Sequence, residues 1–504
     1  MLYELVDVCS EKMKDKIAIV SQNNIYSYSM IKLYSDRLAS MLLDNQLGKG
    51  KFIGILMHRG AKTIIAMLAV LKCGGVYIPM NDKWPKYIIK NIAKDCKVDG
   101  IILEQNLSNK VDSSLCRLIN IDNFAWDEER EVHYNHWNKD ENSLTYMLYT
   151  SGSTGNPKGV CFNNEAVCEY LKWVRQTFEI DKNDKILSIS ALTFDISVFE
   201  IYGALTNGAT LYIPKDQIKI LPNDLSRYME KQRITIIYTV PTMYINLCKR
   251  GNLCYRNLNA LRWVLFAGEE YDIVSFLELT SCLDQNVKYA NLYGPTETNV
   301  CAYYVVEPDA LKNMKKIPIG KSISGDGYIV MGEDGNIIKQ PDLEGELYIY
   351  GKCIMEGYLH NQDKTIWYSD KNIKERAYKT GDIVSIDSNG DLIFHGRKDN
   401  MVKISGYRVE LLEIKEYIQS IPEVQNVLVT DYKDDIGHKL VAFVISERCD
   451  QKELRNKIIN VCKEKLPKYA IPSKVLFVPE FEYTDTGKAN GKQMIQKYIE
   501  IIRK

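Results

Sequence analysis

Short apolar segments alternate with amphipathic segments over the first part of the chain. In the segments Ser29–Leu43 and Ala61–Leu71, apolar residues recur at helical spacing. The expected strands are Ile25–Tyr28, Phe52–Met57, Leu144–Tyr149, Lys185–Ser190, Thr210–Ile213, Ile234–Thr239 and Trp263–Phe266. Strands that alternate with helices predict sheets covered by helices on both faces. We therefore expect an α/β fold with αβα-layered subdomains.

The pattern changes after about Ile317, where short strands and glycine turns predict a small β-rich subdomain. These strands are Tyr328–Met331, Glu346–Tyr350, Ile383–Ile386 and Leu392–His395. A polar break follows at Gly396–Asn400. We expect a large N-terminal domain, residues 1–398, and a small mobile α+β C-terminal domain, residues 399–504, with the hinge at Asp399.

The C-terminal segment has a β-α-β-β-α rhythm. Helices are expected at Leu411–Gln419 and Lys452–Lys465, and strands at Val424–Tyr432 and Lys439–Ile445.

Composition narrows the class of protein. The chain has 65 basic and 65 acidic residues, so no net field attracts it to nucleic acid or to an anionic membrane. No apolar run approaches the ~20 residues of a membrane span, and the N-terminus lacks a signal pattern. The 13 cysteines include no C-x-x-C pair. We expect reduced thiols in a cytoplasmic protein rather than a disulfide framework.

A turn rich in glycine and hydroxyl groups follows the expected strand Leu144–Tyr149. Its candidate phosphate-binding residues are Thr150, Ser151, Gly152, Ser153, Thr154, Gly155 and Lys158. Glycines, with Gly159 among them, can adopt positive φ and leave backbone N–H groups bare for an anion. The spacing differs from G-x-x-x-x-G-K-[ST], so this is not the common nucleotide loop. The alternative is a flexible turn.

Two further segments contain candidate nucleotide-binding and metal-binding residues. Asn291-Leu292-Tyr293-Gly294-Pro295-Thr296-Glu297 ends a buried-type strand, and Tyr378-Lys379-Thr380-Gly381-Asp382 contains a tight turn. Tyr293 could stack on a purine, Thr296 could bind a phosphate, and Glu297 could hold Mg²⁺ together with phosphate oxygens. Asp382 could accept ribose hydroxyls. The alternatives are an N-capping threonine and an ordinary hairpin acid.

Together these segments resemble the T-S-G-[ST]-T-G-x-P-K, Y-G-x-T-E and Y-[RK]-T-G-D motifs of the acyl-adenylate-forming enzymes. The resemblance covers essentially the whole chain. It implies ATP and Mg²⁺ as cofactors, and activation of a carboxylate as its AMP anhydride. It assigns catalysis to Lys488, Glu297 and Thr154. It assigns ATP binding to the loop residues above and to Asn291, Tyr293, Gly294, Thr296, Asp382 and Arg397, with Glu297 on the metal.

The C-terminal segment can be aligned with the family's catalytic-lysine motif in two ways. Thr484-Asp485-Thr486-Gly487-Lys488 fits the family's T-x-x-G-K motif, and Lys492 fits its basic position four residues later. A mobile lysine can contact the substrate carboxylate and the α-phosphate together. We favour Lys488; the alternative register makes Lys492 catalytic. Ser405 stands where peptide-synthetase relatives usually have arginine.

The segment Phe194–Glu200 resembles the F-D-x-S-V segment of amino-acid adenylation domains of nonribosomal peptide synthetases. There the aspartate, here Asp195, meets the substrate α-ammonium; the alternative is an acid capping a helix at Ser197. The other pocket positions fall on Ile196, Phe199, Tyr238, Leu265, Ala267, Leu292, Val300 and Cys301, with Lys488 on the substrate carboxylate. This set has no charge apart from Asp195 and Lys488, so a charged substrate side chain would be buried unpaired. We expect Leu, Ile, Val or Cys ahead of Phe.

No carrier module with a G-G-x-S serine follows Lys488 in this sequence. We therefore expect a freestanding, monomeric amino acid–carrier protein ligase that loads the phosphopantetheine thiol of a separate carrier protein. Two alternatives stay open: D-alanine activation for teichoic acids, and a catalytically silent binding relative.

Overall fold

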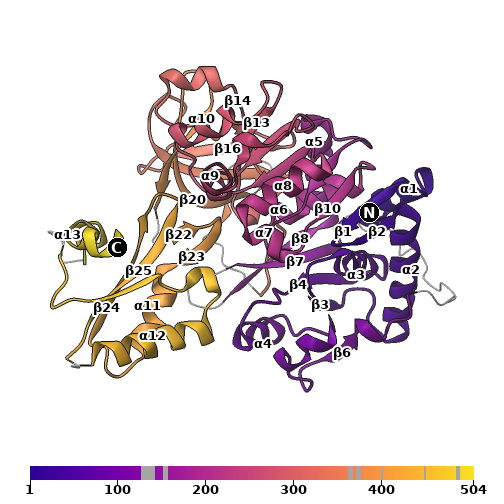
Figure 1. The fold of residues 1–504 in the computed structure, drawn as a ribbon, viewed down its shortest axis with the longest axis horizontal. Coiled ribbons are helices and arrows are strands. Elements are labelled where there is room, and N and C mark those ends of the chain that lie inside the picture. The colour runs from indigo at the N-terminus through magenta and orange to yellow at the C-terminus, as the bar shows by residue number, and fades with distance from the viewer. Residues whose placement is uncertain are drawn as a thin grey trace. The chain divides into compact units, whose positions relative to one another are not determined.

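The computed structural model describes residues 1–126, 142–150, 157–360, 367–369, 376–398, 401–447, 450–483 and 489–503 (Figure 1). The chain forms two compact units. The first comprises Met1–Asp82, Ala93–Tyr149 and Gly159–Lys398, and the second comprises Lys83–Ile92, Thr150–Lys158 and Asp399–Lys504. The predicted hinge residue Asp399 lies outside the described residues. Among the described residues, no helix is long and apolar enough to cross a membrane.

A nine-stranded sheet contains five of the expected strands of the first unit, in the order β15-β14-β13-β12-β11-β9-β10-β1-β2. Its strands are β1 (Ile17–Ser21), β2 (Asn24–Ser27), β9 (Lys185–Leu187), β10 (Thr210–Ile213), β11 (Ile236–Thr239), β12 (Trp263–Phe266), β13 (Lys288–Tyr293), β14 (Ala302–Val306) and β15 (Lys321–Ser322). The strands from β13 to β1 run parallel, and β14, β15 and β2 are antiparallel edges.

Successive residues of the parallel strands enter two different hydrophobic clusters. In β11, Ile237 packs with the cluster that contains residues of α8, α9 and α10, whereas Tyr238 packs in the larger cluster on the other face. In β12, Val264 packs in the cluster with residues of α8, α9 and α10, and Leu265 packs in the larger cluster. Side chains alternate across a strand, so these apolar runs are buried on both faces, as expected for a covered parallel sheet.

A seven-stranded sheet forms the second layer, in the order β18-β8-β7-β4-β3-β5-β6. Its strands are β3 (Phe52–Leu56), β4 (Val76–Pro79), β5 (Gly100–Leu103), β6 (Arg117–Asn120), β7 (Leu144–Thr150), β8 (Lys158–Asn163) and β18 (Gly357–Tyr358). A five-stranded sheet contains β16 (Asp326–Met331), β17 (Gly345–Gly351), β19 (Trp367–Tyr368), β20 (Ala377–Ile386) and β21 (Leu392–Arg397). The last sheet is antiparallel and confirms the predicted β-rich subdomain.

The described residues before Asp399 contain ten α-helices. They are α1 (Leu2–Lys12), α2 (Tyr28–Asp44), α3 (Ala61–Lys72), α4 (Lys86–Asp95), α5 (Asn164–Phe178), α6 (Ile196–Val198), α7 (Asp216–Ile220), α8 (Pro222–Gln232), α9 (Pro241–Arg250) and α10 (Ile273–Ser281). Side-chain caps begin several of them: Asn163 accepts from the Ala166 N–H, and Asp272 accepts from the Ser275 N–H.

A buried ion cluster joins the first three helices. Lys72 Nζ, at the end of α3, lies 2.7 Å from Asp7 Oδ1 of α1 and 2.5 Å from Asp36 Oδ1 of α2. Lys32 Nζ adds a second cation 2.8 Å from Asp36 Oδ2. Lys72 is fully buried, and these two carboxylates lie within hydrogen-bonding distance of its ammonium group.

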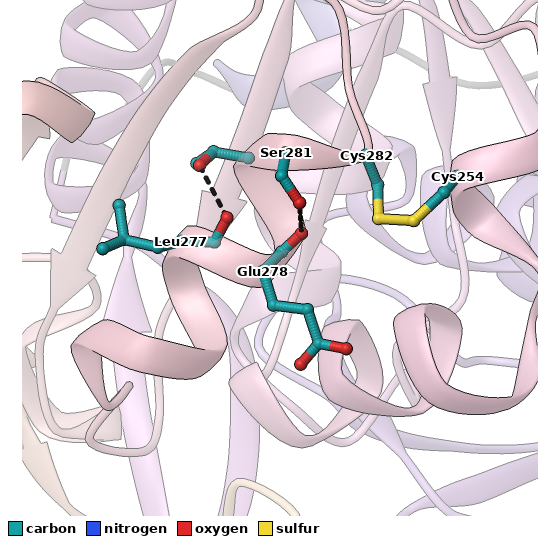
Figure 2. The surroundings of a disulfide bond; sticks show 6 residues. Cys254, Leu277, Glu278, Ser281 and Cys282 are labelled. Carbon is teal, nitrogen blue, oxygen red and sulfur yellow. Dashed lines mark hydrogen bonds between the residues drawn. A yellow bond between two sulfur atoms is a disulfide. The ribbon is translucent and has the colours of Figure 1, made fainter.

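A disulfide joins Cys254, in the short helix η4 (Leu253–Tyr255), to Cys282, which follows the last residue of α10 (Figure 2). The expectation of reduced thiols is wrong for this pair. The other ten cysteines of the described residues form no disulfide. The partners are 28 positions apart, and only the packing of η4 beside the end of α10 brings them together.

The second unit contains a hairpin and a three-stranded sheet. The hairpin pairs β22 (Met401–Ile404) with β23 (Tyr407–Glu410), and Ser405 and Gly406 both have positive φ in its turn. The sheet contains β24 (Asn426–Lys433), β25 (His438–Ile445) and β26 (Lys474–Phe477). Helices α11 (Leu411–Gln419) and α12 (Gln451–Lys465) cover one face, and α13 (Gly491–Arg503) contributes Met494 to the cluster on the other.

Candidate active site

Seven of the eight predicted pocket side chains lie in one hydrophobic cluster. Tyr238 and Leu265 are neighbours in register on β11 and β12, and the Phe199 ring meets the Tyr238 ring edge-on at 5.1 Å between centroids. The cluster members from the predicted set are Ile196, Phe199, Tyr238, Leu265, Ala267, Leu292 and Val300. All seven are buried, so this part of the site is an apolar surface formed by the ends of β11–β13 and the segment from α6 to η3 (Phe199–Gly203).

Cys301 lies elsewhere. It is fully buried in a neighbouring cluster that contains Tyr293 and Ala302, and its thiol donates a weak hydrogen bond to the Tyr293 carbonyl at 3.6 Å. Burial raises the pKa of the Cys301 thiol, which keeps it neutral. The structure therefore does not group Cys301 with the seven other pocket residues.

Asp195 begins α6 and is half-buried. Its Oδ1 accepts from the Ile196 N–H at 2.9 Å, while the Ser197 N–H donates to the Phe194 carbonyl. Asp195 therefore caps α6 through the N–H of Ile196, whereas the helix-cap alternative from the sequence placed the cap at Ser197. Burial raises the pKa of Tyr170 and of Tyr238, and the Asp195 charge raises both further. Asp195 is therefore close enough to these two buried tyrosines for its charge to act on them.

Glu200, which the sequence did not single out, organises the segment before Asp195. It is fully buried, and its Oε1 accepts from the N–H groups of Ile189 and Ser190 at 3.1 and 3.0 Å. Its Oε2 accepts from Ser188 Oγ at 2.8 Å, and Arg59 Nη2 donates to the same hydroxyl at 2.6 Å. The carboxylate takes backbone donors that a longer β9 would use, which explains why β9 ends at Leu187 and not at Ser190.

Glu297 lies in the short helix η5 (Thr296–Thr298) and is 1% exposed. Tyr358 Oη donates to its Oε1 at 2.5 Å, and the Tyr378 hydroxyl lies 3.4 Å from that of Tyr358. Burial raises the pKa of Tyr358, and the charge of Glu297 raises it further, so this phenol remains a donor. The sequence reasoning missed Tyr358, because it lies 61 positions from the acid it contacts.

Asp382 is 2% exposed on β20 and is held by two partners. Tyr293 Oη donates to Oδ2, and Arg397 Nη1 of the neighbouring strand pairs with Oδ1. Arg397 also donates to the Thr380 carbonyl at 3.1 Å. The structure thus brings together the three predicted nucleotide-binding residues Tyr293, Asp382 and Arg397.

The predicted phosphate loop is described only at its ends. Thr150 is the last residue of β7 and Lys158 the first of β8, while Ser151, Gly152, Ser153, Thr154 and Gly155 lie outside the described residues. Gly159, named among the glycines that can adopt positive φ, does not do so: it lies inside β8 and is not among the described glycines with positive φ. A Cβ there would meet Met147 Sδ at 2.4 Å, so the glycine provides space.

The remaining predicted positions are spread over both units. Asn291 Nδ2 donates to the Pro318 carbonyl at 2.8 Å. A Cβ on Gly294 would lie 1.5 Å from the Asn299 carbonyl, so this position requires glycine. Thr296 is the first residue of η5. Lys488 lies outside the described residues, and Lys492 is exposed in the first turn of α13.

Comparison with known protein families decides the class. The AMP-binding enzyme family matches residues 6–359, and the AMP-binding enzyme C-terminal domain matches residues 413–488. The chain belongs to the AMP-binding enzyme family. This confirms the resemblance to acyl-adenylate-forming enzymes, which are ATP-dependent ligases.

The relatives and solved structures agree with this family. Tyrocidine synthase 1 of Brevibacillus parabrevis is 28% identical over 98% of the chain, which spans 44% of that relative. The L-proline–[L-prolyl-carrier protein] ligase of Streptomyces coelicolor is also 28% identical, with 91% of this chain and 90% of that ligase covered.

Among solved structures, the Vibrio cholerae adenylation domain AlmE in complex with glycyl-adenosine-5'-phosphate superimposes with a TM-score of 0.86. It is 22% identical, with 99% of this chain and 98% of that chain covered. The match confirms the α/β fold class.

Proposed function

We propose that this AMP-binding enzyme activates a neutral amino acid with ATP, forming an aminoacyl-adenylate and pyrophosphate. The observation that carries the proposal is the position of Asp195, a half-buried carboxylate directly before Ile196, which is one of seven predicted pocket residues buried in the same hydrophobic cluster. A carboxylate beside such a surface favours a cationic partner, which the α-ammonium of an amino acid supplies. The apolar cluster favours a medium, uncharged side chain, because a charged one would be buried without a counter-ion.

The nucleotide contacts are proposed from the residues around Asp382 and Glu297. Asp382, held by Tyr293 and Arg397, has the acceptor oxygens that ribose hydroxyls require. Glu297 is a buried carboxylate of the kind that binds Mg²⁺ together with phosphate oxygens. The loop from Thr150 to Lys158 would bind the phosphates, and Lys488 would contact the substrate carboxylate and the α-phosphate.

We propose that the second substrate is the phosphopantetheine thiol of a separate carrier protein. In support, the Streptomyces coelicolor relative is named a ligase for a prolyl-carrier protein. One structural neighbour, 20% identical to this chain, is described as a nonribosomal peptide synthetase protein containing adenylation and carrier (PCP) domains.

Amino-acid-dependent ATP–pyrophosphate exchange tests the proposal. The panel consists of the 20 common amino acids and D-alanine, with wild-type enzyme and Asp195→Ala. We expect the wild-type enzyme to catalyse exchange with an uncharged amino acid. In Asp195→Ala we expect substrate binding to weaken by about 2–5 kcal/mol, because a charge-assisted partner of the α-ammonium is removed. If Asp195→Ala keeps the wild-type preference for the amino acid over its des-amino analogue, Asp195 serves only as a helix cap.

D-alanine activation is the second candidate. It is favoured only if the buried side chains Phe199, Tyr238 and Leu292 leave room for a single methyl group and nothing larger. Exchange with D-alanine alone would select it. Exchange with no amino acid would favour the silent relative.

A further inference from the structure

Tyr149, which directly precedes the predicted phosphate loop Thr150–Lys158, is held by helix α4. It is 7% exposed, and its hydroxyl donates to Asp95 Oδ2, at the end of α4, at 2.6 Å. Burial, with contributions from Cys96 and Asp95, raises the pKa of Tyr149, so the phenol stays protonated and acts as the donor. The two residues are 54 positions apart, so this hydrogen bond is a tertiary contact between α4 and the end of β7.

The ring of Tyr149 also reaches the strand that follows the loop. β7 and β8 are neighbours in the sheet, and Gly159 is the second residue of β8. A Cβ on Gly159 would lie 3.2 Å from Tyr149 Cζ, the carbon that carries the hydroxyl. The glycine therefore lets the Tyr149 ring lie close to the backbone of β8. One side chain thus links the two strand ends between which the loop runs.

Asp95 itself is fixed relative to Gly159 by the segment that follows β18. The Leu359 N–H donates to the Gly159 carbonyl at 2.8 Å, and Nε2 of the next residue, His360, lies 2.6 Å from the Asp95 carbonyl. A carbonyl only accepts, so this nitrogen carries the proton. All of these residues, with Tyr149, belong to the first unit. The carboxylate of Asp95 is therefore a fixed acceptor for the Tyr149 hydroxyl.

The carboxylate of Asp95 is unfavourable for α4 itself. Asp95 is the last residue of that helix, and it is exposed. The C-terminal end of a helix carries partial negative charge, which favours a cation such as Lys94 and disfavours an acid. The contact with Tyr149 gives the acid a role outside the helix, because a charged acceptor forms a stronger hydrogen bond with a phenol than a neutral acceptor does.

We propose that Asp95 and Tyr149 form a positioning pair for ATP: the carboxylate holds the phenol, and the phenol ring holds the two ends of the phosphate loop in place. This inference rests on the proposed function, in which that loop binds the phosphates. A binding segment that is ordered beforehand loses less conformational freedom when its ligand binds. The pair therefore strengthens ATP binding and leaves amino-acid binding unchanged.

Calorimetric titration with ATP and Mg²⁺ tests the pair, using the wild type, Asp95→Ala, Tyr149→Phe and the double variant. We expect the Kd for ATP to rise about fivefold or more in each single variant, because a hydrogen bond to a charged group is lost. The double variant should bind ATP no more weakly than the weaker single variant, since both changes remove the same hydrogen bond. An unchanged Kd in the folded single variants, or effects that multiply in the double variant, overturns the inference.

Two further variants separate positioning from folding. Asp95→Asn keeps an acceptor oxygen, so its Kd should lie closer to that of the wild type than the Kd of Asp95→Ala does. Asp44→Ala removes an exposed acid from the last position of α2 and is the matched control, for which we expect an unchanged Kd. A rise in Asp44→Ala as large as that in Asp95→Ala overturns the inference. If Asp95→Ala fails to fold, Tyr149→Phe, which keeps the ring, decides.

Pyrophosphate exchange gives a second readout. In Asp95→Ala and Tyr149→Phe we expect a higher KM for ATP at an unchanged KM for the amino acid. Equal rises in both KM values indicate a general loss of structure and overturn the inference, while the proposed function stands. A wild type that binds ATP but exchanges with no amino acid contradicts the proposed function alone, and the Kd values then decide the inference. A wild type that binds no ATP contradicts both.

Discussion

The hydroxyl of Tyr358 holds the buried carboxylate of Glu297 through a hydrogen bond of 2.5 Å. Tyr358→Phe removes that donor and keeps the ring. Hydrogen bonds to charged groups contribute about 1.5–3 kcal/mol, so we expect pyrophosphate exchange to fall by about 10–100-fold. If Glu297 binds Mg²⁺, the Mg²⁺ concentration for half-maximal exchange will also shift. Tyr350→Phe controls for the loss of a hydroxyl elsewhere; equal effects of the two changes would contradict this role.

Lys72 is the cation on which the packing of α1, α2 and α3 depends. Lys72→Met leaves Asp7 and Asp36 with less compensation in a buried site, and breaking a buried pair in this way costs about 3–5 kcal/mol. We expect a lower Tm in calorimetry and a lower denaturant midpoint. Lys62→Met, at an exposed position of the same helix, is the control. A Tm within the range of that control would show that the two carboxylates are accommodated without Lys72.

Glu413 predicts a pH dependence of the small unit. Burial, together with the negative charges of Glu410 and Glu416, raises its pKa to about 7. In the unfolded chain the value is 4.5, so the stabilising contribution is complete below about pH 4.5 and is lost as the pH rises through about 7. We expect Glu413→Gln to gain stability relative to wild type between pH 5 and pH 8 in urea unfolding. Glu464→Gln, at an exposed position of α12, should show no such gain.

Lys488 and Lys492 differ in their expected roles. Lys488→Ala should reduce pyrophosphate exchange by about 10²-fold or more, since an electrostatic donor to the reacting groups is lost. Lys492→Ala, at the exposed start of α13, is the matched control. The opposite result, loss in Lys492→Ala alone, would mean that the second register is the right one.

Asp399 is predicted to be the hinge between the two half-reactions. Proline at this position fixes φ near −65° and removes a donor, so Asp399→Pro should restrict rotation there. We expect exchange within about tenfold of wild type and a much larger loss of carrier loading. The two half-reactions are measured separately, with a phosphopantetheinylated carrier. Equal losses in both would exclude a hinge role.

The local pattern of apolar and polar residues was sufficient to predict several strands and helices of the fold. The strands Thr210–Ile213 and Trp263–Phe266 and the helix Leu411–Gln419 have the predicted bounds, because continuous apolar runs and helical spacing are properties of neighbouring residues. The expected strand Lys185–Ser190 is too long because Glu200, ten or more positions away, takes the backbone donors of Ile189 and Ser190.

The same limit applies to the site. Asp382 and Arg397 could be found from motifs, yet Tyr358 could not, since its significance depends on a hydrogen-bond partner that only the folded chain brings close. The pairing of Cys254 with Cys282 was missed for the same reason.

The alternation of side chains in β11 and β12 has a consequence for how this protein can diversify. Tyr238 and Leu265 pack in the cluster that contains the other predicted pocket residues, whereas Ile237 and Val264 pack in the cluster that contains residues of α8, α9 and α10. Substitutions that reshape one face leave the packing of the other in place. Evolution, or a directed library at Tyr238 and Leu265, can therefore explore new substrates while the opposite face continues to hold the scaffold together.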